Sequence, residues 1–380
     1  MQYNLVFAGG GAKGIVHVGA LKELETQGHT FKRLVGTSAG AITATLLAAG
    51  YNADEIQDAI TEKLPDDRII LASFTDVPDS FDDEVISRSL TTALTNEIIP
   101  NFVSDGASRR LVESTTATLL RNGTYRTLFS LVELGGLYAG DTFLNWMREK
   151  LDADGRGLGD ATLAQFRTQT GADLTCVATD TVAGTPLNLN HRTAPGLPVA
   201  WAVRMSMSIP LVFQEVLWRA EWGPYLNQDV TGHSVVDGGI YSTLPLELLL
   251  SHEAAVLDAM GGVPSPSSVI GLYIDSTLPV PGAEAAPPKK QNMEQRLKSD
   301  SPWSRIVRRI SDLVNTMTKS HDNLMMHTYP KTICRLPAQG YDTLEFDMSD
   351  ERVKLLVDAG QAAMRQHLEG RMAAKPKESQ

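Results

Sequence analysis

Two short stretches near the start of the chain decide the fold: LVFAGGGAKG at residues 5–14 and LVGTSAG at residues 34–40. In each stretch an apolar run typical of a buried strand ends abruptly in glycines, and a segment with helical periodicity follows. The sequence therefore predicts strand, loop and helix twice in succession. This is how an α/β sheet with helical crossovers begins.

Further strands and helices are expected along the rest of the chain. The apolar patterns predict strands at residues 174–179, 235–236, 269–274, 332–336 and 344–346. They predict helices at residues 54–64, 108–120, 141–151, 201–207, 301–326 and 353–368, with Asp141 as an N-cap.

The composition is that of a folded protein and argues against several classes of function. The 380 residues are 42% hydrophobic and 21% charged, which is typical of a globular domain rather than a disordered chain. The net charge of −11 argues against a nucleic-acid partner, which would require a basic face. Cys176 and Cys334 lack a CxxC partner, which argues against a disulfide framework and a cysteine-ligated zinc site.

The first glycine-rich loop, GGGAKG at residues 9–14, has the features of an anion site. Glycines expose backbone N–H groups, and the start of the following helix adds a positive partial charge. Dinucleotide-binding folds use a similar loop, but they also need an acidic residue at the end of the second strand. Here the second strand ends Leu34-Val35-Gly36, so the dinucleotide interpretation is disfavoured.

The second loop, GTSAG at residues 36–40, is a GxSxG motif between a strand and a helix. In this context the flanking glycines allow a tight turn that exposes the serine hydroxyl as a nucleophile. The alternative is a serine that only caps a βα turn. If the two strands are adjacent and parallel, both loops meet at one edge of the sheet. Ser38 and the N–H groups of the first loop then face one pocket.

A serine nucleophile needs a base, and the sequence offers one clear candidate. The eight histidines lie in no recognisable motif, whereas Asp237 stands between two valines and two glycines at the end of an expected strand. A carboxylate within about 2.6–3.2 Å of the Ser38 hydroxyl could accept its proton directly. Taken alone, Asp237 could instead stabilise its own turn. A Ser-His-Asp esterase or peptidase and a non-catalytic scaffold protein therefore remain alternatives.

GGGAKG, GTSAG and DGG at residues 237–239, in this order and spacing, resemble the patatin-like phospholipase family. Supporting blocks are residues 178–180, residues 204–210 and Pro245. The resemblance is clearest over residues 3–51, 137–150, 174–247 and 268–275.

The resemblance implies a three-layer α/β/α fold with a central, mostly parallel sheet and a helical insertion. It also implies a lipid acyl hydrolase of the phospholipase A or lysophospholipase type, which needs no metal ion and no cofactor. By matching positions, Ser38 is the nucleophile and Asp237 the base. The residues that would form the oxyanion hole are Gly10, Gly11 and Ala12, and the motif positions that would support the site are Gly9, Lys13, Gly14, Gly36, Gly40, Gly238 and Gly239. One departure is Thr243, where relatives commonly carry Asn, and this leaves open how the Asp237 loop is supported.

Because Ser38 and Asp237 must meet, we expect residues 1–275 to form one catalytic α/β domain. Within it, residues 52–134 are expected to be a helical insertion and a candidate lid. The expected remainder is a Pro-rich linker or loop at 276–300, a helical region packed on the domain at 301–370, and a polar tail at 371–380.

The expected substrate is a phospholipid or another acyl lipid. The chain start lacks the basic segment of a signal peptide, so we expect a cytoplasmic protein, with signal-less secretion still open. A peripheral membrane contact is compatible with the basic residues that flank the apolar stripe of the 301–326 helix, although core packing is the simpler interpretation of that stripe. The basic residues are Lys289, Lys290, Arg296, Lys298, Arg305, Arg308, Arg309 and Lys319. The sequence does not indicate protein partners.

Overall fold

The computed structural model describes residues 1–98, 116, 118–283, 309, 316, 326 and 328–373. Its centre is an eight-stranded sheet with the strand order β10-β9-β1-β2-β4-β8-β7, and β5 pairs with β4 outside this path. The strands are β1 (Gln2–Phe7), β2 (Thr30–Thr37), β4 (Asp173–Asp180), β5 (Thr185–Leu189), β7 (Val216–Leu217), β8 (Ser234–Asp237), β9 (Val269–Pro279) and β10 (Ile333–Gln339). A separate two-stranded sheet pairs β3 (Gly136–Tyr138) with β6 (Leu211–Phe213).

The strands from β10 to β4 are parallel, and β5, β7 and β8 are antiparallel to their partners. The predicted class, an α/β fold with a central, mostly parallel sheet, is confirmed. Parallel strands are buried on both faces, which explains why the second half of β1 is a continuous apolar run rather than an alternating one. Leu5, Val6 and Phe7 are fully buried.

Helices connect or follow these strands in the part of the chain that the structure describes. They are α1 (Val16–Thr26), α2 (Ala39–Ala48), α3 (Ala53–Thr61), α4 (Asp83–Arg88), α5 (Leu90–Ile98), α7 (Gly123–Glu133), α8 (Asp141–Asp152), α9 (Leu163–Thr170), α10 (Val199–Ser206), α11 (Glu247–Leu250), α12 (Ala254–Met260) and α16 (Asp350–Ala373). The prediction of Asp141 as an N-cap is wrong. Gly140 occupies that position with a left-handed backbone, and Asp141 is the first residue of α8.

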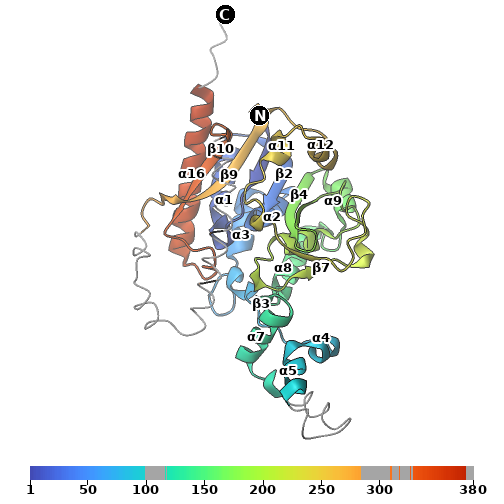
Figure 1. Cartoon of the computed structure of the whole chain (residues 1–380). Helices are drawn as coiled ribbons and strands as arrows, with labels where there is room; N and C mark the ends of the chain where they lie inside the picture. The colour runs from blue at the N-terminus through green and yellow to red at the C-terminus, as the bar shows by residue number, and fades with distance from the viewer. Residues whose placement is uncertain are drawn as a thin grey trace, which may run out of the picture.

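The segment expected as a helical insertion holds α3, α4, α5 and α7. Figure 1 shows α4, α5 and α7 projecting below the body of the molecule. Two phenylalanines, Phe81 and Phe129, pack against each other in this projection, with ring centroids 4.6 Å apart. Most of the expected helix at 108–120 lies outside the described residues.

The chain beyond residue 275 contributes to the sheet itself. β9 continues to Pro279, into the range expected as a linker, and β10 then pairs with β9 at the edge of the sheet. The helix α16 runs beside β10 and α1, as Figure 1 shows. The strand predicted at residues 344–346 is wrong, because these residues form a turn between β10 and α16.

The helix expected at residues 301–326, for which the sequence allows both core packing and a membrane contact, lies largely outside the described residues. Of its basic residues only Arg309 is described, and it is helical and exposed. In the described ranges, no helix combines the length and the hydropathy that a membrane span requires.

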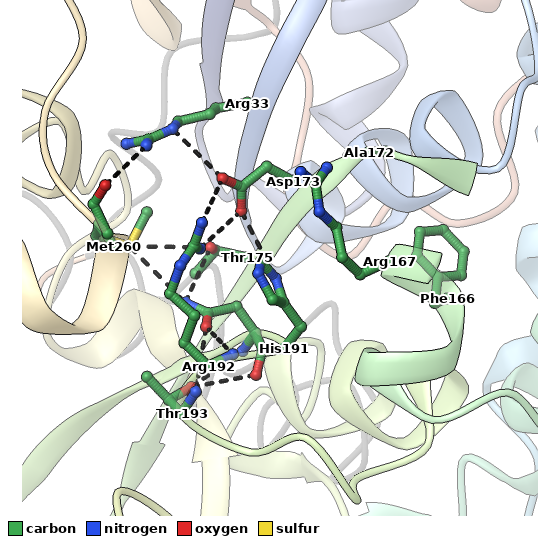
Figure 2. Close-up of polar contacts among 12 residues, drawn as sticks. Arg33, Phe166, Arg167, Ala172, Asp173, Thr175, His191, Arg192, Thr193 and Met260 are labelled. Carbon is green, nitrogen blue, oxygen red and sulfur yellow. Dashed lines mark hydrogen bonds and ion pairs between the residues drawn. The ribbon is translucent and has the colours of Figure 1, made fainter. Parts of the chain in front are cut away.

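A cluster of charged residues around the buried Asp173 joins β2 and β4. It lies at the amino end of β4, away from Ser38. Figure 2 shows Arg33 and Arg192 turned toward the Asp173 carboxylate at the start of β4. Arg192 binds both carboxylate oxygens at 3.0 Å, and Arg33 Nε lies 3.4 Å from Oδ2. Burial raises the pKa of Asp173, but the hydrogen bonds and charge of the arginines outweigh it and hold that pKa below its usual range. The cluster therefore ties the two strands together.

Candidate active site

Ser38 stands in a tight turn between β2 and α2. Its backbone is left-handed in φ (54°) with ψ at −125°, a rare conformation for a non-glycine residue. The turn requires glycine on both sides. A Cβ at Gly36 would collide with the Gly40 carbonyl, and one at Gly40 would collide with the Phe7 carbonyl. The GxSxG motif thus forms a tight strand–turn–helix elbow, in which Ser38 is buried.

The strand register brings Asp237 to Ser38. Thr37 of β2 pairs with Val177 of β4, and the next residue of β4, Ala178, pairs with Asp237 at the end of β8. Ser38 and Asp237 therefore flank the same point of β4. The Ser38 hydroxyl donates a hydrogen bond to the Asp237 carboxylate, and the Gly239 N–H donates a second one at 2.6 Å.

The Asp237 carboxylate is buried, and this sets its protonation. Burial raises its pKa to about 7, against the opposing effect of the hydrogen bonds from the Ser38 hydroxyl and the Gly239 N–H. A carboxylate with a pKa near neutral is a better proton acceptor than an ordinary aspartate and is still largely ionised just above neutral pH.

The segment at the end of α10 holds both residues through hydrogen bonds. The Ser38 N–H donates to Ser206 Oγ at 3.0 Å, and Ser206 Oγ donates to the Val177 carbonyl at 2.6 Å. The Asp237 N–H donates to the Ser208 carbonyl at 2.9 Å. The sequence marks this segment only through the resemblance of residues 204–210, so the role of Ser206 could not be predicted.

Arg204, which is fully buried, secures the same segment. Its guanidinium donates to the Ala139 carbonyl at 2.6 Å, to the Gln214 carbonyl at 3.1 Å and to the Ser208 hydroxyl. Burial lowers its pKa to about 10, so the side chain stays cationic at neutral pH.

The glycine loop lies beside Ser38, and its N–H groups differ in availability. A Cβ at Gly9 would lie 3.2 Å from the Ser38 Cβ. The Gly9 N–H donates to the Thr243 carbonyl, and the Ala12 N–H donates to the Thr343 carbonyl, both at 2.9 Å. Of the three residues expected in an oxyanion hole, Ala12 thus has its N–H engaged by the protein. Within the described hydrogen bonds, the Gly10 and Gly11 N–H groups have no such acceptor.

Two neighbouring residues have roles that the sequence left open. Lys13 is buried, and its ammonium donates to the Ser276 hydroxyl at the end of β9 at 3.1 Å. Thr243 supports the glycine loop, because its backbone carbonyl accepts the Gly9 N–H.

An apolar pocket opens at Ser38. Its lining is Gly11, Ala12, Gly14, Ile15, Ser38, Ala39, Ile42, Thr43, Ile60, Leu71, Phe74, Met207, Ile209, Phe213 and Phe346. Phe74 comes from the region expected as an insertion, and no sequence pattern placed it near Ser38. Phe346 comes from the turn before α16.

The described histidines do not reach this pocket. His17 is buried in α1 against Phe7, and burial lowers its pKa to about 3. His233 pairs with Asp180 at 2.7 Å, and His191 lies 3.8 Å from Asp173. Two histidines, His321 and His327, lie outside the described residues.

A second, larger cavity of about 690 Å³ lies at the opposite end of the strands. Its lining includes Tyr3, His29, Thr332 and Arg371, which stand at or before the amino ends of β1, β2 and β10 and near the end of α16. The cavity is therefore separate from the Ser38 pocket, which lies at the carboxyl ends.

A family model described as "Patatin-like phospholipase" matches residues 5–250. Uncharacterized protein YqhO of Bacillus subtilis (strain 168) is 26% identical over 368 residues, which cover 95% of this chain and 96% of the relative. A cUMP-AMP-activated phospholipase of Escherichia coli is 44% identical over 66 residues, 16% of this chain and 21% of that protein.

Among solved structures, VipD from Legionella pneumophila is 16% identical, with a TM-score of 0.49. The match covers 97% of this chain and 67% of that chain. The type III effector protein ExoU is also 16% identical, with a TM-score of 0.42. That match covers 97% of this chain and 53% of that chain.

Proposed function

Because the chain belongs to the patatin-like phospholipase family, we propose that it hydrolyses fatty-acyl esters of membrane lipids, with Ser38 as the nucleophile and Asp237 as the base. The observation that carries this proposal is the hydrogen bond from the Ser38 hydroxyl to a buried carboxylate whose pKa is raised to about 7. The family assignment by itself indicates a lipid ester hydrolase. The dyad and its individual steps are our inference.

In the acylation step, Asp237 accepts the Ser38 proton while Ser38 Oγ attacks the ester carbonyl carbon. The carbonyl oxygen becomes an oxyanion, and the N–H groups of Gly10 and Gly11 stabilise it in this proposal. When the tetrahedral intermediate collapses, the proton held by Asp237 passes to the leaving alcohol or lysolipid. The acyl group remains on Ser38.

In the deacylation step, a water molecule replaces the leaving alcohol. Asp237 takes a proton from the water as its oxygen attacks the acyl carbonyl, and the same N–H groups stabilise the second oxyanion. Collapse returns the proton to Ser38 Oγ and releases the fatty acid. Asp237 thus acts as base and then as acid in both halves of the reaction.

The lining of the pocket supports an acyl substrate. Apart from Ser38 and Thr43, its side chains are all apolar, and three of them are aromatic. An alkyl chain gains free energy when it leaves water for such a surface, at about 0.8 kcal/mol for each buried methylene group. A polar head group finds no matching partner there, so we place it outside the pocket.

A dyad is favoured over a Ser-His-Asp triad because the Ser38 hydroxyl already has a carboxylate acceptor. Among the described histidines, none lines the pocket. A non-catalytic scaffold is disfavoured for another reason, because it has no need to hold a serine in a strained turn beside a buried carboxylate.

The test is hydrolysis by purified Ser38→Ala and Asp237→Asn variants. We expect each to lose at least about three orders of magnitude in kcat on p-nitrophenyl butyrate and on phospholipid vesicles, because each removes a group that moves in the reaction. Ser38→Ala should also lose labelling by a fluorophosphonate probe. The controls are Ser265→Ala and Asp258→Asn, which change the same residue types at exposed positions.

Undiminished activity in folded Ser38→Ala would overturn the assignment. Activity that survives Asp237→Asn but disappears in a histidine-to-alanine scan would favour the triad. Mass spectrometry of the products from a panel of defined lipids would then identify the head group and the bond that is cleaved.

A further inference from the structure

The turn between β10 and α16, residues 340–346, reaches the glycine loop of the proposed site. The Thr343 carbonyl oxygen accepts the Ala12 N–H at 2.9 Å. It also lies so close to Gly11, whose φ is +56°, that a Cβ at this position would collide with it. This turn, which we call the β10–α16 turn, lies outside residues 5–250 that match the family model.

The same turn places an aromatic ring in the Ser38 pocket. Phe346 is half-buried and lines the pocket together with Phe74 and Phe213. The Phe346 and Phe213 ring centroids are 6.4 Å apart, in an edge-to-face arrangement. The cavity that these side chains enclose is only about 50 Å³. Pockets that hold small-molecule ligands usually measure roughly 300–1,000 Å³.

Arg352 of α16 holds the turn in this position. Its guanidinium donates to both carboxylate oxygens of Glu345, at 2.6 and 2.9 Å, and to the Gly340 carbonyl at 2.9 Å. It also lies over the Tyr341 ring, 4.1 Å from the centroid, and the Tyr341 hydroxyl donates to the Arg352 carbonyl at 2.9 Å. A bidentate arginine–carboxylate pair fixes geometry as well as contributing energy, so the turn is held at both ends.

We propose that the β10–α16 turn forms a wall of the acyl pocket, that Phe346 determines which acyl-chain lengths are accepted, and that Arg352 is the latch that holds this wall in place. The inference rests on the proposed function, because it concerns the substrate of the same site. It assigns selectivity to the part of the chain that follows the family-model match.

The size of the cavity explains the expected selectivity. With Phe346 in place, the cavity holds only the first carbons of an alkyl chain, and the rest of a fatty-acyl chain has to extend through its open side. The substitution Phe346→Ala replaces a benzyl group with a methyl group. It opens space next to Ser38 without removing any hydrogen bond of the proposed dyad. Longer chains should gain from this space, whereas a short chain that never reaches the ring should not.

The test is the ratio of kcat/KM for p-nitrophenyl palmitate to kcat/KM for p-nitrophenyl butyrate. We expect Phe346→Ala to raise this ratio by roughly tenfold or more, since a difference of one methylene in an apolar pocket already discriminates by about that factor. Phe346→Trp should lower the ratio. The matched control is Phe81→Ala, which removes a phenylalanine that packs on Phe129 outside the pocket and should leave the ratio unchanged.

Two milder variants keep the test decisive if Phe346→Ala does not fold. Phe346→Leu keeps an apolar side chain of smaller volume, and Arg352→Met removes the latch without touching the pocket. Both should raise the ratio. Lys354→Met is the control for the second, because it removes an exposed cation from the same helix. A ratio that stays at the wild-type value in the folded Phe346 variants and in Arg352→Met overturns the proposal.

Experiments can distinguish an error in the proposed function from an error in the proposed acyl-pocket wall. If the wild-type protein hydrolyses neither ester and Ser38 is not labelled by fluorophosphonate, the proposed function fails. Palmitate binding, measured by calorimetry in the Ser38→Ala background, then tests separately whether Phe346 limits the space for an acyl chain. A Kd that falls about tenfold on adding Phe346→Ala supports the wall, and an unchanged Kd overturns it.

Discussion

Asp237 faces two opposing demands. It must be buried to lie beside Ser38, and it must be ionised to accept the Ser38 proton. The structure reconciles them in part, since the Ser38 hydroxyl and the Gly239 N–H both donate to the carboxylate and oppose the rise in pKa that burial causes. The remaining pKa, about 7, lies near the pH at which the residue has to work.

This pKa predicts the pH dependence of the reaction. Asp237 must be deprotonated to act, so kcat/KM should be half-maximal near pH 7 and fall roughly tenfold per pH unit below it. The profile of kcat/KM for p-nitrophenyl butyrate, which reports the free enzyme, measures this directly. A profile that stays flat down to about pH 5, where only an ordinary aspartate would still be ionised, contradicts the raised pKa.

At the residue scale the motifs identified the two residues of the proposed dyad but not their surroundings. Gly36 and Gly40 identified Ser38 because a strained turn allows few alternatives, and small neighbours identified Asp237. The engagement of the Ala12 N–H could not be predicted, because its acceptor, Thr343, is remote in sequence. The role of Ser206 could not be predicted either, because a buried serine in a helix has no distinctive sequence signal.

Among the elements, α10 and the residues just after it link Ser38 to Asp237. Ser206 accepts the Ser38 N–H, and the Ser208 carbonyl accepts the Asp237 N–H. Because both contacts come from one short segment, the relative position of the two catalytic candidates depends on how rigid that segment is. Arg204 provides this rigidity through its bonds to two distant carbonyls.

Ser206→Ala should therefore lower kcat about tenfold or more with little change in KM. The Ser38 N–H would lose its acceptor, and an unsatisfied buried donor costs about 1–3 kcal/mol. Steady-state kinetics and thermal unfolding measure the two effects. The control, Ser130→Ala, removes an equally buried hydroxyl that bonds to Gly136. It should lower stability but not kcat, and equal kinetics in the two variants would argue against positioning by Ser206.

Long apolar strands were predictable, whereas short and peripheral elements were not. β1, β2, β4 and β9 are recognisable because each contains a run of consecutive buried residues with adjacent apolar side chains. β3, β6 and β7 are two or three residues long, too short for any periodicity. Residues 344–346 have a strand-like composition, but they lie in a turn. Phe346 contributes to the wall of the pocket and not to a sheet.

For the molecule as a whole, an important contact is the packing of α16 against α1. Both helices have a glycine at their crossing, where the backbones approach closely. A Cβ at Gly360 would collide with the Val16 carbonyl, and one at Gly19 would collide with the Val357 carbonyl. This crossing attaches the C-terminal region to the first helix of the chain.

Gly360→Ala should therefore destabilise the whole protein by about 1–3 kcal/mol, the usual cost of overpacking. The control is Gly370→Ala in the same helix, where a Cβ meets nothing within 4 Å and where alanine should stabilise slightly. Urea unfolding measures both changes. Equal midpoints for the two variants would show that the crossing does not limit stability.

The need for Ser38 and Asp237 to meet predicts one unit over residues 1–275, which stays a prediction. Ser38 follows β2 and Asp237 ends β8, and both strands pair with β4 in the central sheet. What the sequence did not indicate is that β10 joins that sheet. Its partner, β9, precedes it by more than fifty residues, and pairing over such a distance leaves no local pattern.

The latched turn also has a consequence for biosynthesis. A ribosome that has reached β8 has already made Ser38 and Asp237, but it has not yet made Phe346 or Arg352. Since folding proceeds as the chain emerges, the reacting groups exist before the wall that selects among substrates. If the proposed wall is right, substrate choice is the last property that the growing chain acquires, and a nascent chain that stops before Phe346 has both residues of the proposed dyad but not the wall.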